Sequence, residues 1–246
     1  MLNAFAKTDT GKTRSLNQDA IFACTKPLGP LPNLFIIADG MGGHKGGEIA
    51  SKAAITAFVN YIKESETVSA DNTLDLLTTA ARHANHAVLQ QAEQNSDLSG
   101  MGTTLTACTI INNSESDKYN IVHVGDSRAY AITQDSITRL TTDHTFVNEM
   151  IKAGQMSQSE AREHPKRNVL TRVLGIALDM NTDGYIHKLE PGTNILLCSD
   201  GLYNMVSEDK IREMSNNSDD PAEALVTAAN DNGGTDNISV ILIKVN

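Results

Sequence analysis

The order of segments along this chain of 246 residues excludes most simple architectures. Two long segments with helical spacing of apolar residues follow one another directly, from Ile49 to Tyr61 and from Leu74 to Val88, and Asp71 has a residue type preferred at the N-cap of the second. Short apolar and β-branched runs, which predict strands, lie before and after this pair. Because the runs do not alternate with helices, the order predicts mostly antiparallel sheets covered by helices, an α+β layered fold.

Nine runs predict strands, at residues 2–8, 19–24, 34–39, 103–111, 119–125, 128–133, 184–189, 194–198 and 238–245. Shorter helices are predicted after Thr145, Ser157 and Ser207, and a last one has Asp220 at its N-cap and Pro221 at its first position. The sequence contains no internal repeat and no Pro-rich linker. Since single layered domains reach about 250 residues, we expect one domain over residues 1–246.

The formal net charge is −10, from 20 Lys and Arg against 30 Asp and Glu. This balance argues against a general nucleic-acid binder, which neutralises phosphates with basic side chains. The sequence has no apolar run long enough to cross a bilayer, and because residues 1–7 lack a basic leader followed by an apolar stretch, we expect no secretory signal. Cys24, Cys108 and Cys198 lie far apart in apolar runs, which is typical of buried, reduced thiols. We therefore expect a monomeric cytoplasmic protein without membrane insertion or a nucleic-acid partner.

Two apolar runs end in the same pair of residues, Asp39-Gly40 and Asp200-Gly201. A single Asp-Gly pair most often marks a hairpin turn. Neither of these is followed by an alternating strand, however, because the first leads into the Gly-rich segment 41–47 and the second into helical sequence. Two further loops carry acidic residues beside turn formers, with Asp126 after Gly125 and Asp236 after Thr235. A turn between paired strands therefore does not explain this set.

We infer that these four aspartates meet at one end of the strands. At about 4 Å and an effective dielectric near 20, each pair of like charges costs about 4 kcal/mol. Such a cluster requires bound protons or bound cations. Carboxylates and carbonyl oxygens suit hard ions such as Mg²⁺ and Mn²⁺, whereas zinc sites are built from clustered Cys and His. The hypothesis from the residues alone is a site for divalent cations.

Seven motifs then occur in a characteristic order: Thr8-Asp9-x-Gly11-x-x-Arg14-x-x-Asn17-Gln18-Asp19, Asp39-Gly40-Met41-Gly42-Gly43-His44, Gly102-Thr103-Thr104, Gly125-Asp126-Ser127-Arg128, Asp143-His144-Thr145, Ser199-Asp200-Gly201-Leu202 and Gly234-x-Asp236-Asn237. Over nearly its whole length the chain resembles the bacterial branch of the PPM metal-dependent protein serine/threonine phosphatases (type 2C). It departs from the family pattern at Thr193, where Asp is common, and at Ser239, where Thr is common. We expect neither position to contact the acidic set.

The resemblance implies a four-layer αββα sandwich, in which two mostly antiparallel sheets are flanked by helix pairs. It implies hydrolysis of phosphoserine and phosphothreonine in proteins by water that two metal ions activate, without a covalent intermediate. The partners implied are phosphoproteins, including a cognate serine/threonine kinase or its substrates, so that the enzyme reverses kinase signalling. Residues from about 146 to 168 correspond to the family's flap beside the site.

The resemblance also implies a metal-ligand set for Mn²⁺ or Mg²⁺, with two ions per site. The Asp39 carboxylate corresponds to the ligand that bridges both ions, and the Gly40 carbonyl to a ligand of one of them. Asp200 and Asp236 correspond to ligands of the other ion. Asp19 resembles an outer ligand that acts through water.

Three further roles are implied beside this set. Asp126, together with Asp200, resembles the third-metal site of the bacterial members. Arg14 resembles the residue that grips the substrate phosphate, for which a planar guanidinium is suited. His44, in the Gly-rich loop, is the candidate proton donor to the leaving alkoxide, with a loop-shaping role as the alternative. We interpret His144 as structural. The predicted catalytic residues are therefore Arg14, Asp39 and His44.

Other nucleotide and phosphate chemistries fit the sequence less well. The run from Ala6 to Thr13 matches a relaxed P-loop pattern, but residues 14–24 lack the helical period that such a loop requires. None of the three cysteines has an arginine six positions later, and no Asp-x-Asp occurs. His83 and His86 are expected on a helix surface. A phosphatase-like sensor without turnover would be missing a metal ligand or the arginine, and all are present.

Overall fold

The computed structural model describes residues 2–43, 45–66, 69, 72–113 and 116–245, which form two sheets. The first sheet contains, in spatial order, β1 (Leu2–Asp9), β11 (Ile238–Val245), β10 (Asn194–Cys198), β7 (Arg128–Ile132) and β8 (Ile137–Arg139). The second contains β2 (Asp19–Cys24), β3 (Leu34–Met41), β5 (Leu105–Asn113), β6 (Ser116–Val124) and β9 (Asp183–Lys188), and the short β4 (Gly102–Thr103) pairs with β3. The strand pairs of these described ranges are antiparallel.

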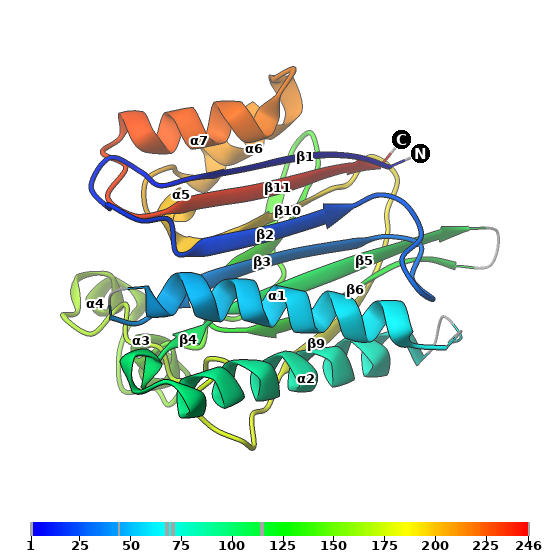
Figure 1. The fold of residues 1–246 in the computed structure, drawn as a ribbon. Coiled ribbons are helices and arrows are strands. Elements are labelled where there is room, and N and C mark those ends of the chain that lie inside the picture. The colour runs from blue at the N-terminus through cyan, green and yellow to red at the C-terminus, as the bar shows by residue number, and fades with distance from the viewer. Residues whose placement is uncertain (1, 44, 67–68, 70–71, 114–115, 246) are drawn as a thin grey trace.

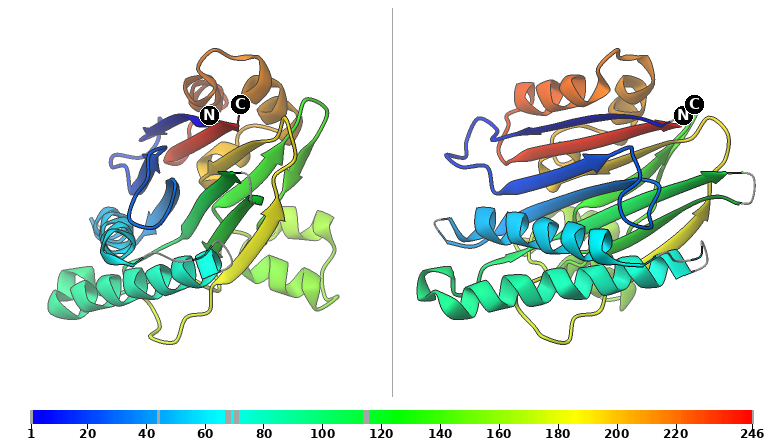
Figure 2. Two further views of the ribbon diagram at one scale, coloured as in Figure 1. Left: turned by 90° about the vertical axis from the view of Figure 1, so that its right-hand side faces the viewer. Right: turned by 45° about the vertical axis from the view of Figure 1, so that its right-hand side comes forward.

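Helices cover the outer face of each sheet (Figure 1). The long helices α1 (Gly46–Glu64) and α2 (Thr73–Gln94) pack on the second sheet, and α6 (Glu208–Asn217) and α7 (Pro221–Asp231) pack on the first. The end-on view in Figure 2 shows the two sheets stacked between these helix pairs. Short helices complete the chain: η2 (Ser96–Leu98), α3 (Phe146–Lys152), α4 (Gln158–Glu163) and α5 (Asp200–Tyr203). The predicted αββα sandwich is confirmed.

Strand β3 illustrates why an apolar run becomes a central strand. Its side chains alternate between two faces, so Leu34 and Ile36 enter the core beneath α1 and α2. Phe35 and Ile37 enter the core between the sheets instead. Because both faces are buried, the run is apolar throughout rather than alternating.

The helix caps agree with the sequence in most places. The side chains of Thr145, Ser157 and Asp220 each accept a backbone hydrogen bond at the start of α3, α4 and α7. Ser207 precedes α6 but makes no such bond. Helix α2 begins after Asn72, and the predicted cap Asp71 lies outside the described residues.

Three features differ from the predictions. The run 103–111 is divided into β4 and β5, because Thr104 leaves the ladder and its backbone N–H donates to the Asp39 carbonyl. The three-residue strand β8 was too short to be predicted. Cys108 and Cys198 are buried thiols as expected, whereas Cys24, at the end of the edge strand β2, is only half-buried.

The strand directions bring five connections to one edge of the sandwich. Strands β3 and β10 end at this edge, while β2 and β11 begin there, since neighbouring strands run in opposite directions. The turn from β6 to β7 lies at the same edge, because β6 pairs with β5 and β7 with β10. In Figure 1 this edge is at the left, beside the N-terminus of α1. Within the described ranges, no helix is both long enough and apolar enough to cross a membrane.

Candidate active site

Two of the predicted aspartates lie directly opposite each other. Asp19, the first residue of β2, is paired with Asp39 of β3. Cross-strand partners have Cβ atoms only about 5 Å apart, so two negative charges face each other here. The backbone of Asp39 is fixed on its other side, where its N–H donates to Thr104 Oγ1 at 2.9 Å and its carbonyl accepts from Thr103 Oγ1 at 2.9 Å. The Gly-Thr-Thr motif therefore positions Asp39.

The loop that carries Arg14 is attached to the loop that carries Asp236. The side chain of Asn237 accepts a hydrogen bond from the Gln18 N–H at 2.8 Å and donates to the carbonyls of Thr10 and Leu16, both at 2.9 Å. Gly11, at φ +78°, allows this approach, since a Cβ there would collide with the Asp236 carbonyl. The first and last motifs of the sequence thus form one structural unit.

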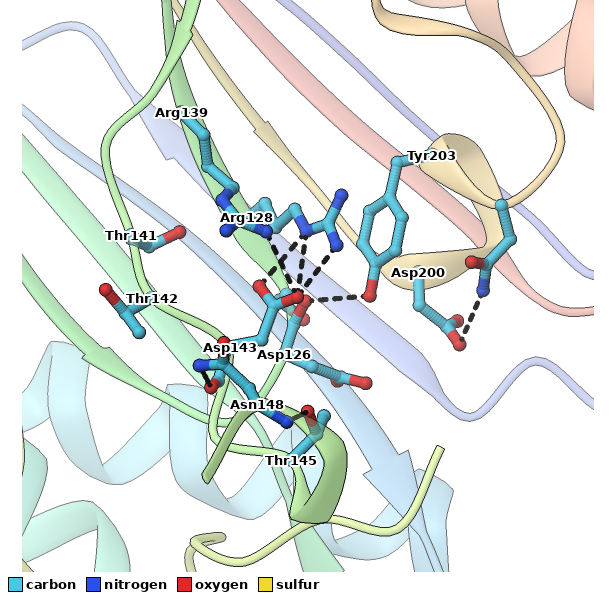
Figure 3. A network of polar contacts seen from close by, with 12 residues as sticks. Asp126, Arg128, Arg139, Thr141, Thr142, Asp143, Thr145, Asn148, Asp200 and Tyr203 are labelled. Carbon is cyan, nitrogen blue, oxygen red and sulfur yellow. Dashed lines mark hydrogen bonds and ion pairs between the residues drawn. The ribbon is translucent and has the colours of Figure 1, made fainter. Parts of the chain in front are cut away.

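A polar network joins the Asp126 loop to the helix that begins with Asp200 (Figure 3). The Tyr203 hydroxyl, three residues after Asp200, donates to the Asp126 carbonyl at 3.0 Å. The Arg128 guanidinium lies 3.5 Å from the centre of the Tyr203 ring and pairs with Asp143 through Nη2 at 2.7 Å. These contacts join the Asp126 backbone to the helix that begins with Asp200.

The same network reaches the predicted flap region. Asn148 of α3 donates to the Asp143 carbonyl at 2.6 Å. His144 is fully buried, and its Nδ1 accepts a hydrogen bond from the Gly125 N–H at 3.1 Å. The ring proton must then reside on Nε2, which lies 3.1 Å from Asp183 Oδ2. Burial lowers the pKa of His144, in agreement with a neutral imidazole that supports the Asp126 loop.

The acidic side chains influence one another strongly. Burial, followed by the charges of Asp19 and Asp200, raises the pKa of Asp39 well above its usual range. Burial, followed by Asp126 and Asp236, does the same for Asp200. Burial raises the pKa of Asp126 to about 7 and that of Asp19 to about 6. The described residues thus include an acidic cluster that is destabilised when it is fully ionised.

Arg14 supplies a positive charge to this cluster. Its Nη2 donates to Asp236 Oδ2 at 2.8 Å, and about half of the arginine side chain is exposed to solvent. The sequence predicts a phosphate-binding role for Arg14 and a metal-binding role for Asp236, but not that the two side chains pair. The pairing places the positive charge of Arg14 against the carboxylate of Asp236.

The residues present fit a site for hard divalent cations. Among the described residues, no group of three or more His, Cys, Asp or Glu side chains is arranged to hold a metal ion unaided. Mg²⁺ characteristically binds through only one or two carboxylates and keeps several waters, so smaller sets suffice. Asp19 Oδ1 is buried without any hydrogen-bond partner, which leaves a charged oxygen available to a coordinated water. The donor set consists of oxygens, as Mg²⁺ and Mn²⁺ prefer.

The structure brings nearly all of the predicted site residues to this edge: Arg14, Asp19, Asp39, Gly40, Asp126, Asp200 and Asp236. The predicted proton donor His44 lies outside the described residues. Ser239 lies closer to the acidic set than expected: its N–H donates to Ser199 Oγ at 3.0 Å, Ser199 in turn donates to Asp19 Oδ2 at 2.8 Å, and Ser239 lowers the pKa of Asp19. Tyr203 was missed, since a single aromatic residue after the Asp-Gly pair has no distinguishing pattern.

The described part of the chain also bears on two alternatives that the sequence disfavours, a P-loop at residues 6–13 and metal binding by His83 and His86. Lys12 and Thr13 donate their N–H groups to the Gly234 carbonyl, and no helix begins there, so the P-loop pattern is not a phosphate-binding loop. His83 and His86 are exposed on α2, as expected.

Known proteins resemble this chain over almost its full length. The family model described as protein phosphatase 2C matches residues 10–233. The serine/threonine phosphatase stp of Listeria innocua is 35% identical over 251 aligned residues, covering 100% of this chain and 96% of the relative. The solved structure of the S. agalactiae serine/threonine phosphatase superimposes with a TM-score of 0.91 at 36% identity, covering 100% of both chains.

A metal-containing structure is also similar. The catalytic domain of the serine/threonine protein phosphatase PstP, solved in complex with two manganese ions, superimposes with a TM-score of 0.83 at 32% identity. The alignment covers 99% of this chain and 97% of that one. The order of the motifs, the sandwich of two sheets and the acidic edge lead to the same conclusion as these similarities. The chain belongs to the protein phosphatase 2C family and is a protein serine/threonine phosphatase.

Proposed function

We propose that the acidic edge is the reaction centre and that it hydrolyses phosphoserine and phosphothreonine without a covalent enzyme intermediate. The observation that carries this proposal is the meeting of five aspartates at one edge of the sandwich, four of which, Asp19, Asp39, Asp126 and Asp200, have pKa values raised by burial and by neighbouring carboxylates. Such a cluster costs folding free energy that bound cations offset. The cysteine and aspartate nucleophile patterns of other phosphatases do not occur in the sequence.

In this proposal Asp39, the Gly40 carbonyl, Asp200 and Asp236 would hold two divalent cations. Asp19 binds through a water, for which its unpartnered Oδ1 is available. Asp126 joins Asp200 in a third position. Bound Mn²⁺ or Mg²⁺ supplies a water-derived nucleophile at neutral pH and neutralises charge on the phosphoryl oxygens.

The chain's own residues position the substrate and neutralise its charge. Arg14 exchanges its bond to Asp236 for two oxygens of the phosphate, which its planar fork matches. Its attachment through the Asn237 hydrogen bonds holds the loop while the side chain changes partner. His44 stays our candidate for the proton that the leaving alkoxide requires.

The helical segment from about 146 to 168 is proposed to form a flap of the single domain 1–246. It is joined to the site through the Asn148 hydrogen bond to the Asp143 carbonyl. We also propose a cytoplasmic location, since all three cysteines are unpaired, as is usual in reducing compartments. There the enzyme would act on phosphoproteins made by a serine/threonine kinase and so reverse its signal.

The test is phosphate release from matched phosphothreonine and phosphotyrosine peptides, with Mn²⁺ and with a chelator. We expect release from the phosphothreonine peptide that requires Mn²⁺. Asp39→Asn should lower kcat at least a hundredfold, because it removes the proposed bridging charge, whereas Asp135→Asn, in the exposed β7–β8 turn, removes the same charge without this loss. Full activity in chelator, or normal turnover by Asp39→Asn, would contradict the proposal.

A further inference from the structure

Beside the acidic edge, the surface contains a cavity of about 950 Å³. Its walls come from Met41, at the end of β3, and from the segment 168–181, which follows α4 and forms neither a helix nor a strand. The volume is near the upper end of the range of about 300 to 1,000 Å³ that is usual for ligand pockets. The cavity is therefore large enough for one or two amino-acid side chains.

The cavity gathers apolar surface that the fold leaves exposed. Met41, Val169 and Ile176 line it with exposed fractions of 39%, 47% and 52%. Leu178, in the same segment, is 66% exposed. Only two further large apolar side chains in the described ranges, Leu16 and Ile186, are exposed. Apolar surface concentrated in one place is characteristic of a binding site rather than of scattered surface residues.

The segment is held in place although it has no regular structure. The buried side chain of Asn85, on α2, accepts a hydrogen bond from the Gly175 N–H at 2.8 Å and donates to the carbonyls of Ala177 and Leu178 at 2.8 and 3.3 Å. Leu174 exchanges two backbone hydrogen bonds with Thr103, at 2.9 and 3.1 Å. The exposed apolar residues are thus presented on a preformed support, which lowers the entropic cost of binding.

The cavity lies next to the candidate active site along strand β3. Met41 lies two residues after Asp39 on the same strand, so both side chains leave β3 on the same face, about 7 Å apart. Thr103, whose hydroxyl holds the Asp39 carbonyl, also holds Leu174 beneath the cavity. An extended peptide advances about 3.3 to 3.6 Å per residue, so a bound phosphopeptide reaches this cavity about two residues from its phosphate.

The two charged residues in the wall, Arg172 and Asp179, do not favour an acidic ligand. Arg172 donates to Asp183 Oδ1 at 2.8 Å and lies 3.9 Å from Glu149, so its charge is already compensated. The amides of Asn168 and Asn181 line the cavity and are suited to hydrogen bonds with a peptide backbone. An aliphatic side chain on an extended peptide matches this combination.

We propose that this cavity binds an aliphatic side chain of the phosphoprotein substrate, located two to four residues from the phosphorylated serine or threonine. The inference rests on the proposed function, because it places the phosphate at the acidic edge. It assigns to the segment 168–181 a part in substrate choice that is separate from the reaction at the aspartates.

The test compares two phosphothreonine peptides that differ only at the third residue on each side, which is Leu in one and Ser in the other. For each peptide kcat and KM are measured with Mn²⁺, and p-nitrophenyl phosphate serves as a substrate too small to fill the cavity. We expect KM for the Leu peptide to be about tenfold lower, because burying one aliphatic side chain in the cavity strengthens substrate binding by about this factor. Ile176→Ser and Val169→Ser should each remove most of this preference, whereas Ile186→Ser, exposed on β9 away from the cavity, should retain it.

The outcomes separate the two proposals. Equal kcat/KM for both peptides, or a preference that survives Ile176→Ser, would overturn the binding cavity and leave the phosphatase activity intact. If none of the three substrates released phosphate, the proposed reaction centre would be refuted instead. Sedimentation of the free enzyme provides a further check, because a dimer that Ile176→Ser abolishes would mean that a second copy covers the cavity, against our proposal.

Discussion

Replacing Asp19 by Asn should stabilise the metal-free enzyme at neutral pH. Burial raises the pKa of Asp19 from 3.8 to about 6, and one of its oxygens has no hydrogen-bond partner. Because a tenfold change in an ionisation constant corresponds to about 1.4 kcal/mol, this increase disfavours the ionised form by about 3 kcal/mol. Asparagine keeps an oxygen for the Ser199 hydroxyl, which donates to Asp19 Oδ2 at 2.8 Å, and removes the charge that faces Asp39.

We therefore expect the free energy of unfolding of Asp19→Asn in chelator at pH 7.5 to exceed that of the wild type by about 1 to 3 kcal/mol. The sign depends on pH. The folded wild type retains a proton that the unfolded chain loses between the unfolded pKa of 3.8 and the folded pKa of about 6, so its stability falls as the pH rises through this window. The advantage of the variant should therefore vanish near pH 3.5 and be complete above pH 7.

The assay is urea unfolding in chelator at these pH values, with Asp135→Asn as the control for loss of one exposed charge. Addition of Mn²⁺ should reduce or reverse the difference, because the cation removes the repulsion in the wild type. A variant that is less stable than the wild type in chelator at pH 7.5, or an advantage that is constant with pH, would refute the reasoning.

The remaining predictions concern Arg14, Tyr203 and the metal. Arg14→Ala should raise KM for a phosphopeptide at least tenfold, with Arg14→Lys recovering only part of the loss; a purely kcat effect would oppose phosphate binding. Tyr203→Phe retains the ring beneath Arg128 but loses the hydrogen bond to the Asp126 carbonyl, so it should weaken the weakest Mn²⁺ site about fivefold; an unchanged calorimetric titration would exclude this positioning role. Mn²⁺ at about a hundred times its Kd should raise the wild-type Tm by about 5 to 10 °C, which differential scanning calorimetry with and without chelator measures; an unchanged Tm would count against a cation site.

The positions of the strands could be predicted because they depend on local pattern. Runs such as 19–24, 194–198 and 238–245 match β2, β10 and β11 in both bounds. The aspartates at 39 and 200 were also recognisable, because each follows an apolar run and precedes sequence that does not continue as a hairpin. The family resemblance then supplied the order of the motifs and the αββα sandwich.

The contacts that assemble the site could not be predicted, because they join residues far apart in sequence. Asp19 faces Asp39 only through the register of β2 against β3, and a shift of one residue would turn one of them away. The pair of Arg14 with Asp236 spans 222 positions. Asn85 supports the segment 168–181 from within α2. Its sequence context is an ordinary helical pattern, which does not reveal what a polar side chain binds.

The most direct test of the central claim is anomalous diffraction from crystals grown in Mn²⁺. We predict two strong anomalous peaks at the acidic edge, with the Asp39 carboxylate between them, the Gly40 carbonyl beside one, and Asp200 and Asp236 beside the other. In the same crystals the guanidinium of Arg14 should have left Asp236. An acidic edge without any peak, with the bond from Arg14 to Asp236 intact, would contradict the account.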